Sequence, residues 1–186
     1  MSETRPYSFE DAEVEFENSP AKIVFLKSLE DFKILDITIE DVKEGTEYEV
    51  AYWIASELVK TGLARFHDES TINATTLYKI HWRETKLQTG RQISSLPAFF
   101  YPQTRRYLKQ LKEKAVSDSA AANEYNNTSR LIQDIVDCRL KKIVSIATSS
   151  AQIEVLRGLS REERILYEYF HLAMLDWKSK ILSLEE

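Results

Sequence analysis

The chain has 186 residues, 43% hydrophobic and 30% charged, with only 4 glycines and 4 prolines. So few helix-breaking residues among many helix-forming ones predict a mainly α-helical globular protein of one or two domains. The net charge of -5 excludes a general electrostatic attraction to nucleic acid, although it does not exclude local basic patches.

The N-terminal third predicts a tail followed by a small α+β domain. Residues 1–21 are acidic and contain few aliphatic side chains, so we expect a flexible acidic tail. Residues 22–68 have short apolar runs and alternation that are typical of a β-rich domain. Its expected elements are strands at 23–26, 34–39 and 63–66, a turn at Gly45, and a helix at 48–61 that ends at Gly62.

Residues 72–186 predict an α-helical bundle domain. Helices are expected at 73–88, 102–115 and 128–148. The polar segment 117–127 either separates the second helix from the third or continues the third helix, and the sequence allows both. A capping box at Ser160–Glu163 predicts the start of a last helix, which carries an apolar stripe of Leu166, Tyr169, Phe170, Ala173, Trp177 and Ile181.

Two prolines, Pro97 and Pro102, bracket a corner of three aromatic residues. Each proline fixes its own φ angle and lacks a backbone donor, so together they predict a rigid turn that limits where the next helix begins. Phe99, Phe100 and Tyr101 carry more apolar area than a surface loop needs. They are therefore expected to dock either on the chain's own core or on a partner.

Two charged residues of opposite sign lie within apolar helix faces. Arg139 falls in the middle of a cluster of isoleucines and other aliphatic residues on the third helix, and Glu84 falls beside Leu77 and Ile80 on the first. We predict that Glu84 and Arg139 form an ion pair, because burying either charge alone is unfavourable. The alternative is that each side chain reaches water along its alkyl stem.

Tyr78 and Trp82 point away from the Leu77 face of the first helix. Burial by a partner, exposure to solvent and packing in an internal core are three alternatives for them. Trp is a frequent anchor of interfaces, which favours a partner.

The sequence shows no active site, metal site or cofactor motif. His67, His81 and His171 are scattered, without carboxylates or histidines at metal-ligand spacing. There is neither a glycine-rich phosphate loop nor a nucleophile elbow. We therefore expect a protein that is not an enzyme and binds no cofactor.

Two features of the sequence predict a cytoplasmic location. The single cysteine, Cys138, allows no internal disulfide. No apolar run is long enough to span a membrane.

The order of several segments resembles the archaeal GINS family of replication proteins. The helical domain matches that family at Trp82–Lys86, Leu96–Tyr101, Ile135–Ile143 and Leu159–Glu163. Residues 22–66 look like the family's small domain, through Phe25-Leu26, Lys43-Glu44-Gly45 and Leu58–Ala64. The small domain precedes the helical one, which resembles the archaeal "two-three" class.

The resemblance implies a non-catalytic scaffold in DNA replication. GINS subunits form a tetramer that links the MCM helicase to a RecJ-like or Cdc-type partner, in a CMG-like helicase associated with the nucleoid. It implies no membrane contact, and contact with DNA that is at most indirect or weak. The residues expected to contact other subunits are Tyr78, Trp82, Phe99, Phe100, Tyr101, Tyr107 and Trp177.

Two other classes of function compete with the scaffold. Residues 50–63 resemble a helix of a winged-helix DNA-binding transcriptional regulator. However, Glu44, Glu47, Glu49 and Glu57 make that region acidic, whereas a helix that faces phosphates needs Lys and Arg. An enzyme is the third class, and it would need an apolar pocket with titratable groups.

Overall fold

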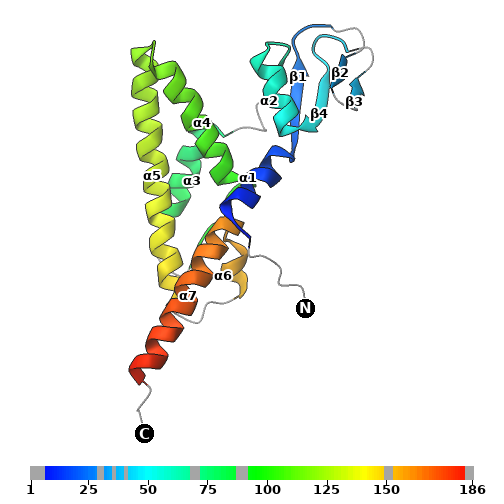
Figure 1. Cartoon of the computed structure of the whole chain (residues 1–186). Helices are drawn as coiled ribbons and strands as arrows, with labels where there is room; N and C mark the ends of the chain where they lie inside the picture. Colours follow the sequence, from blue (N-terminus) through cyan, green and yellow to red (C-terminus); the bar gives the residue numbers. More distant parts are fainter. Residues whose placement is uncertain are drawn as a thin grey trace. The chain divides into compact units, whose positions relative to one another are not determined.

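The computed structural model describes residues 7–28, 32–34, 37–39, 42–67, 72–86, 92–148 and 153–182. The chain divides into two compact units. The helical unit comprises Met1–Ala12 and Ile72–Glu186, and the small unit comprises Glu13–Thr71. The fold is mainly α with a small sheet in the N-terminal part, which confirms the expected fold class (Figure 1).

Helix α1 (Phe9–Glu17) corrects the expectation of a flexible tail over residues 1–21. Ser8 and Asp11 cap its start, since the Ser8 amide donates to Asp11 Oδ2 (2.7 Å) and the Asp11 amide donates to Ser8 Oγ (3.3 Å). Ala12 and Phe16 lie one turn apart, and both are buried. These two apolar residues lie on one side of the acidic helix and pack it against the protein. The composition of the segment does not reveal that they share one side. Residues 1–6 lie outside the described part of the chain.

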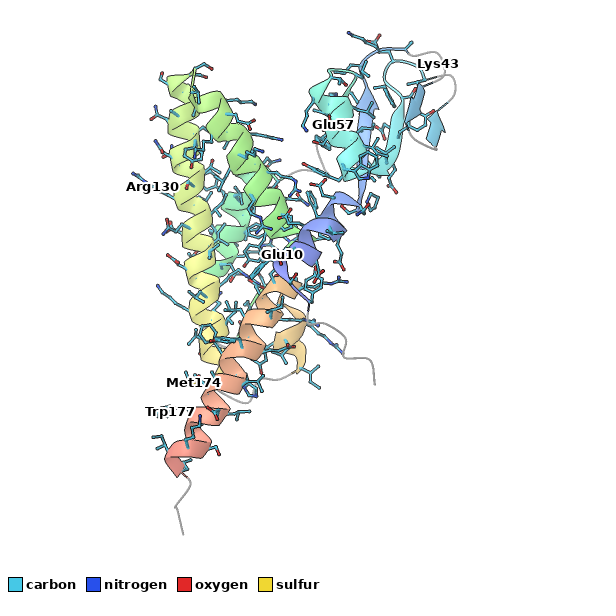
Figure 2. All side chains as sticks on the ribbon, viewed as in Figure 1. Glu10, Lys43, Glu57, Arg130, Met174 and Trp177 are labelled. Atoms are coloured by element: carbon cyan, nitrogen blue, oxygen red, sulfur yellow. The ribbon has the colours of Figure 1, made fainter. Side chains whose placement is uncertain are left out.

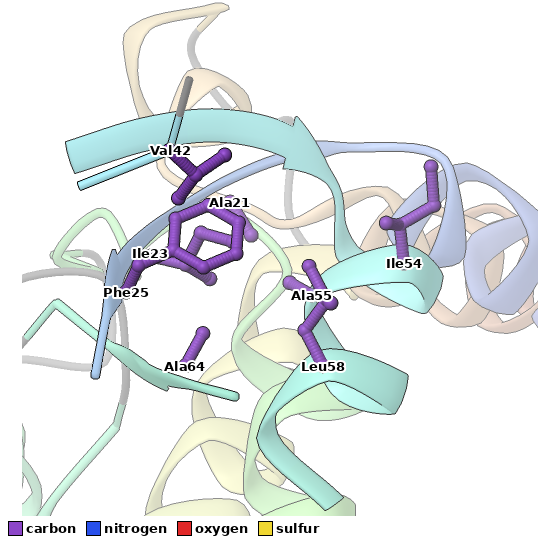
Figure 3. Packing of buried hydrophobic residues seen from close by; sticks show 8 residues of the cluster. All are labelled: Ala21, Ile23, Phe25, Val42, Ile54, Ala55, Leu58 and Ala64. Carbon is purple, nitrogen blue, oxygen red and sulfur yellow. The ribbon is translucent and has the colours of Figure 1, made fainter. Parts of the chain in front are cut away.

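The small unit is built around strand β1 (Pro20–Phe25). It pairs antiparallel with β4 (Glu47–Ala51) on one side and with β5 (Ala64–Phe66) on the other. Helix α2 (Tyr52–Lys60) packs against this sheet. The core that they share, shown in Figure 3, contains Ala21, Ile23, Phe25, Val42, Ile54, Ala55, Leu58 and Ala64.

The sequence misassigned two elements of the small unit. The strand expected at 34–39 is replaced by a separate antiparallel pair, β2 (Phe32–Ile34) and β3 (Ile37–Ile39), with residues 35–36 outside the described part. The helix expected at 48–61 begins only at Tyr52, because Val50 pairs with Ala21 of β1. Sheet pairing depends on a distant strand, so local periodicity could not locate this boundary.

Gly62 ends α2 as expected. Its φ of +70° is the left-handed conformation that glycine adopts without strain. The Gly62 amide donates to the Val59 carbonyl and the Leu63 amide donates to the Leu58 carbonyl, which together make a Schellman motif.

The helical unit contains α3 (Ala74–Lys86), α4 (Phe100–Ala115), α5 (Ser119–Ala147), α6 (Ile153–Arg157) and α7 (Arg161–Leu182). Helix α5 starts at the Asp118 cap, whose side chain accepts from the Ala120 amide (2.8 Å). The segment 117–127 is thus mostly part of α5, which settles the alternative left open by the sequence. Residues 87–88, the expected end of the first helix, lie outside the described part.

Two apolar clusters hold the helical unit together. The first joins α3, α4 and α5 through Ile72, Leu77, Ile80, Phe100, Leu131, Ile132 and Ile135. The second joins the end of α5 to α6 and α7 through Ile143, Ile146 and Leu159, with half-buried Leu166, Tyr167 and Phe170 around them. Between these clusters lies a group of buried charged side chains.

Substituting Phe16 tests whether α1 is an ordered part of the fold. The Phe16 side chain is 3% exposed, and its ring centroid lies 4.2 Å from that of Tyr52. Phe16→Ala should lower the free energy of unfolding by about 3–5 kcal/mol, because it removes a buried aromatic ring and leaves a cavity. Val14→Ala on the same helix, where the side chain is 61% exposed, should have little effect in the same urea titration. A change for Phe16→Ala as small as that for Val14→Ala would contradict the packing of Phe16 in the core.

Candidate functional site

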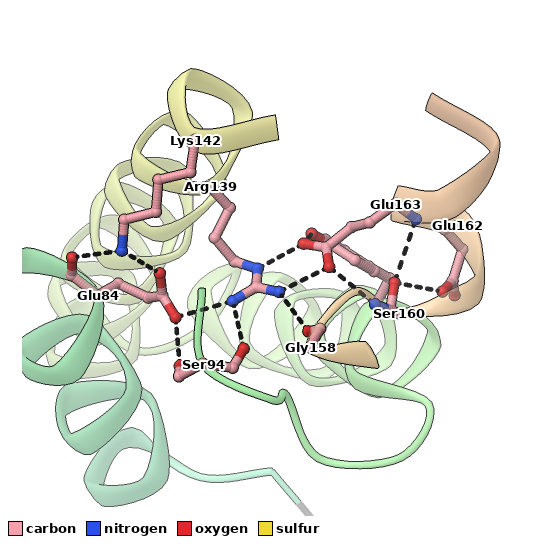
Figure 4. Close-up of polar contacts among 9 residues, drawn as sticks. Glu84, Ser94, Arg139, Lys142, Gly158, Ser160, Glu162 and Glu163 are labelled. Carbon is pink, nitrogen blue, oxygen red and sulfur yellow. Dashed lines mark hydrogen bonds and ion pairs between the residues drawn. The ribbon is translucent and has the colours of Figure 1, made fainter. Parts of the chain in front are cut away.

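Arg139 of α5 is the centre of the buried charged group, with a side chain that is 0% exposed. Its Nη1 donates to Glu84 Oε1 (2.8 Å) and to the Ser94 carbonyl (2.8 Å). Its Nη2 donates to Glu163 Oε2 (2.6 Å) and to the Gly158 carbonyl (3.2 Å), and its Nε donates to Glu163 Oε1. The predicted Glu84–Arg139 pair is therefore present, but Arg139 also binds a second carboxylate (Figure 4).

Glu84 of α3 is bound from three sides. Besides Arg139, Lys142 Nζ donates to Glu84 Oε2 (2.7 Å) and to the Glu84 carbonyl (2.8 Å). Ser94 Oγ donates to Glu84 Oε1. Since Lys142 and Arg139 lie three residues apart on α5, both point to the same face and reach the same carboxylate.

Glu163 performs two tasks at the start of α7. It forms the predicted capping box, because its Oε2 accepts from the Ser160 amide (2.8 Å) and its amide donates to Ser160 Oγ (3.2 Å). Its carboxylate also binds Arg139, and its Oε1 accepts from the Tyr101 hydroxyl (2.7 Å). One side chain thus caps α7 and ties that helix to α5 and to the aromatic corner.

Each cation of the network is paired with a carboxylate inside the protein. The cations of Arg139 and Lys142 face the carboxylates of Glu84 and Glu163, and no buried side-chain nitrogen or oxygen in the described residues lacks a partner.

The network shifts the pKa values of its members. Burial by itself raises the pKa of Glu84, but the hydrogen bonds from Lys142 and Ser94 and the charge of Arg139 outweigh the effect of burial, so the pKa of Glu84 lies below its ordinary value. Burial also lowers the pKa of Arg139, and the bond to Glu163 more than compensates. Burial, with the adjacent Glu163 charge, raises the pKa of Tyr101.

The network joins segments that are far apart in the sequence. It connects α3, the segment containing Ser94, α5 and the turn before α7. Gly158 at that turn is closely packed: a Cβ atom there would lie 2.7 Å from the Ile93 carbonyl oxygen. Because its charged groups are buried and hydrogen-bonded to one another, the arrangement fixes how these segments meet.

The distal part of α7 exposes several large apolar side chains. Beyond the contact of Glu163 with Arg139, α7 runs past the end of α5: His171 Nδ1 lies 3.1 Å from the Ala147 carbonyl and Lys178 Nζ lies 3.4 Å from the Thr148 carbonyl (Figure 1). We call the following residues, each 50–75% exposed, the distal α7 surface: Tyr169, Leu172, Leu175, Trp177, Ile181 and Leu182. Trp177 is labelled in Figure 2, on this end of the helix.

The structure separates the predicted contact residues into buried, half-buried and exposed groups. Phe100 is 1% exposed and belongs to the core of the helical unit, so it is unable to contact another subunit, which corrects that expectation. Tyr101 and Tyr107 are half-buried, and their hydroxyls donate to Glu163 and Glu124. Phe99 is also half-buried, with a φ of 53° at the cap of α4. The exposed members of the set are Tyr78, Trp82 and Trp177.

Sequence reasoning missed two members of the network. Lys142 follows Lys141 on the helix, and two adjacent lysines usually indicate a solvated helix face, although Lys142 lies one turn from Arg139. Glu163 was assigned to helix capping alone, and nothing in a capping box indicates a second partner. Val136 and Leu140 of α5 are partly exposed and line a hollow of about 290 Å³ together with Phe9 of α1.

The histidines lie apart, as their sequence positions suggest. His67 Nε2 lies 3.6 Å from Glu47 in the small unit, whereas His171 stacks on Tyr167 in α7. Within the described residues, no three His, Cys, Asp or Glu side chains are grouped so that they could hold a metal ion. No helix in that part of the chain is long and apolar enough to cross a membrane.

The fold and the site define a helical-bundle protein whose buried polar centre is structural. Residues 71–182 match the family model of Sld5, described as the GINS complex protein helical bundle domain. The match covers more than half of the chain, and the chain therefore belongs to the GINS family of replication subunits. Other GINS subunits are accordingly its partners. A comparison with curated proteins found none that matches this chain.

The winged-helix alternative is not supported. The matching family is a GINS family, and the segment that resembled a DNA-binding helix is strand β4 followed by α2. Helix α2 packs its apolar side, with Ile54, Ala55 and Leu58, against the sheet of the small unit.

Arg139→Met should lower the free energy of unfolding by about 3–5 kcal/mol, because it leaves two buried carboxylates facing a single lysine. In a Glu84→Gln/Glu163→Gln background the same substitution should be nearly neutral or stabilising, since Arg139 is then the uncompensated charge. Urea titrations of the four proteins measure this coupling. Arg130→Met, at an exposed position of α5, is the control and should change stability little. If the loss of free energy of unfolding caused by Arg139→Met were the same in both backgrounds, the result would contradict the network.

The lowered pKa of Glu84 makes stability depend on pH. Between the folded-state pKa and the ordinary value of 4.5, the unfolded chain binds more protons, so stability rises with pH in this interval. The contribution is complete above 4.5 and is lost as the pH falls through the folded-state pKa. In urea titrations below pH 4.5, the free energy of unfolding of Glu84→Gln should therefore fall less steeply with decreasing pH than that of the wild type. Glu57→Gln, at an exposed site, should keep the wild-type slope. An unchanged slope in Glu84→Gln would contradict the prediction.

Proposed function

We propose that this chain is a non-catalytic scaffold subunit of a GINS tetramer that links the MCM replicative helicase to a RecJ-like or Cdc-type partner, in a CMG-like helicase, and activates it. Its membership of the GINS family supports the setting in DNA replication. The position of the small unit before the helical bundle supports the archaeal "two-three" class within that family.

The observation that carries the proposal is the distal α7 surface. Monomeric proteins rarely leave so many large apolar side chains uncovered together. At 3.6 residues per turn they fall on two opposite sides of α7, with Tyr169, Leu172, Leu175 and Leu182 on one side and Trp177 and Ile181 on the other. A helix that is apolar on several sides is normally buried, and here neighbouring subunits would bury it.

The buried network supports this role by fixing the start of α7. Glu163 is held by Arg139 and Tyr101, so the first turn of α7 is anchored to α5 and α4. A rigid helix loses little conformational freedom on association, which favours a stable complex. The two opposite apolar sides suit a subunit with two neighbours, as in a closed tetramer.

The remaining parts of the proposal concern the other partners. The small unit, with its own apolar core, would provide a docking surface for MCM or for a further subunit. The RecJ-like or Cdc-type protein would bind the assembled tetramer. A cytoplasmic location next to the nucleoid follows from this role, and the chain would act without catalysing a reaction of its own.

The mass of the native assembly tests the proposal. Co-expressed with the other GINS subunits of its source, the chain should form a four-subunit species containing one or two kinds of small subunit, as measured by native mass spectrometry. Leu172→Asp/Leu175→Asp and Trp177→Asp alter opposite sides of α7, and each should reduce the assembly to smaller species. Lys112→Asp, at an exposed position of α4, should leave the mass unchanged.

Two results would overturn the proposal. One is a wild-type chain that stays monomeric in the presence of the other subunits. The other is an assembly whose mass is unaffected by both α7 variants. The link to the helicase has a separate measurement, which is retention of MCM and of the RecJ-like protein on the tagged tetramer.

A further inference from the structure

The outer face of α3 differs in chemistry from the distal α7 surface. Tyr78 and Trp82 lie one turn apart on it, and each is 58% exposed. Together with Thr75, Lys79 and Arg83 they line one surface hollow. We call this set, with Lys86 in the next turn, the α3 outer face.

Only positive charge is exposed on this helix. The single acidic residue of α3, Glu84, is buried and bound to Arg139 and Lys142. Lys79 and Arg83 have no ion pair with any described residue, and Lys86 Nζ lies 4.4 Å from the centroid of the Trp82 ring. The α3 outer face is therefore a local basic patch on a chain whose net charge is -5.

The lysines distinguish this face from the centre of a typical protein interface. Such centres are enriched in aromatic residues, methionine and arginine and depleted in lysine. On α3 two lysines and an arginine surround the aromatic rings, whereas the distal α7 surface has four aliphatic residues and two aromatic ones. The two surfaces are thus expected to meet different kinds of ligand.

We propose that the α3 outer face binds single-stranded nucleic acid. Stacking of bases on exposed aromatic rings, with cations that follow the phosphates, is the general chemistry of such sites. Tyr78 and Trp82 are about 6 Å apart along the helix axis, so the two rings can each receive a base of one strand. Lys79, Arg83 and Lys86 lie beside them and neutralise phosphates. A duplex would not expose base faces to these rings.

The charge on this face sets the expected salt dependence. Three phosphate contacts give a slope of about -2 for the logarithm of the binding constant against the logarithm of the salt concentration. The acidic remainder of the chain opposes binding, so the interaction should be measured at low salt. The site lies on a different helix from the distal α7 surface, so this inference does not rest on the proposed tetramer.

Fluorescence anisotropy of a labelled oligothymidylate of about 15 nucleotides, titrated with the full chain, tests the proposal. Trp82→Phe keeps an aromatic face and should bind within about threefold of wild type, whereas Trp82→Leu should bind about tenfold more weakly. Lys79→Glu/Arg83→Glu should abolish binding. The control Lys112→Glu/Lys114→Glu makes the same charge change at exposed positions of α4 and should have little effect. All of these positions are exposed, and circular dichroism verifies that each variant is folded.

Several results would overturn the proposal. Absence of binding at low salt is one, and equal affinities of Trp82→Phe and Trp82→Leu are another, because the ring would then not stack on a base. Equal binding of a duplex, or full competition by an oligoglutamate peptide, would show that the face recognises negative charge alone. Loss of binding when the chain joins its GINS partners would assign the face to a subunit interface.

Discussion

The guanidinium of Arg139, bound between the carboxylates of Glu84 and Glu163, is the interaction on which the helical unit depends. A buried arginine needs negative partners close by, and here they come from α3 and from the first turn of α7. The same contacts bring the Ser94 and Gly158 carbonyls to the guanidinium. Four segments that are distant in the sequence are therefore oriented around one side chain, between two apolar clusters that lack any such directional contact.

This arrangement separates the buried charged centre of the helical unit from the side chains that the unit exposes. Its charged centre is buried and hydrogen-bonded internally, whereas α7 extends beyond the end of α5 with its apolar side chains exposed. Helix α3 faces the network on one side with Glu84 and exposes Lys79 and Arg83 on the other, where neither has an ion pair with any described residue. Because Glu84 is used inside, the outside of α3 has no acid to neutralise its lysines and arginine. The internal contacts thus decide part of the surface chemistry.

Much of the helical unit could be predicted from local patterns. The Glu84–Arg139 pair was inferred because each charge interrupts an apolar face, and the Ser160–Glu163 capping box has a recognisable spacing. Helix α1 was missed because its buried face consists of only Ala12 and Phe16. Strand β4 was mistaken for helix because its pairing with β1 involves residues some thirty positions away. Phe100 was expected to contact a partner, since the sequence left open whether the aromatic corner packs inside or outside.

The sequence by itself determined the mainly helical class, the division into a small and a helical part, and the need for Arg139 to find a carboxylate. These follow from periodicity, turn residues and the unfavourable burial of a lone charge, which are local properties. Only the tertiary structure decided that Glu163 is the second carboxylate, that Lys142 turns inward and that Phe100 is buried while Trp82 and Trp177 are exposed. Those outcomes depend on which segments meet in space, and the spacing of residues along one chain does not contain that information.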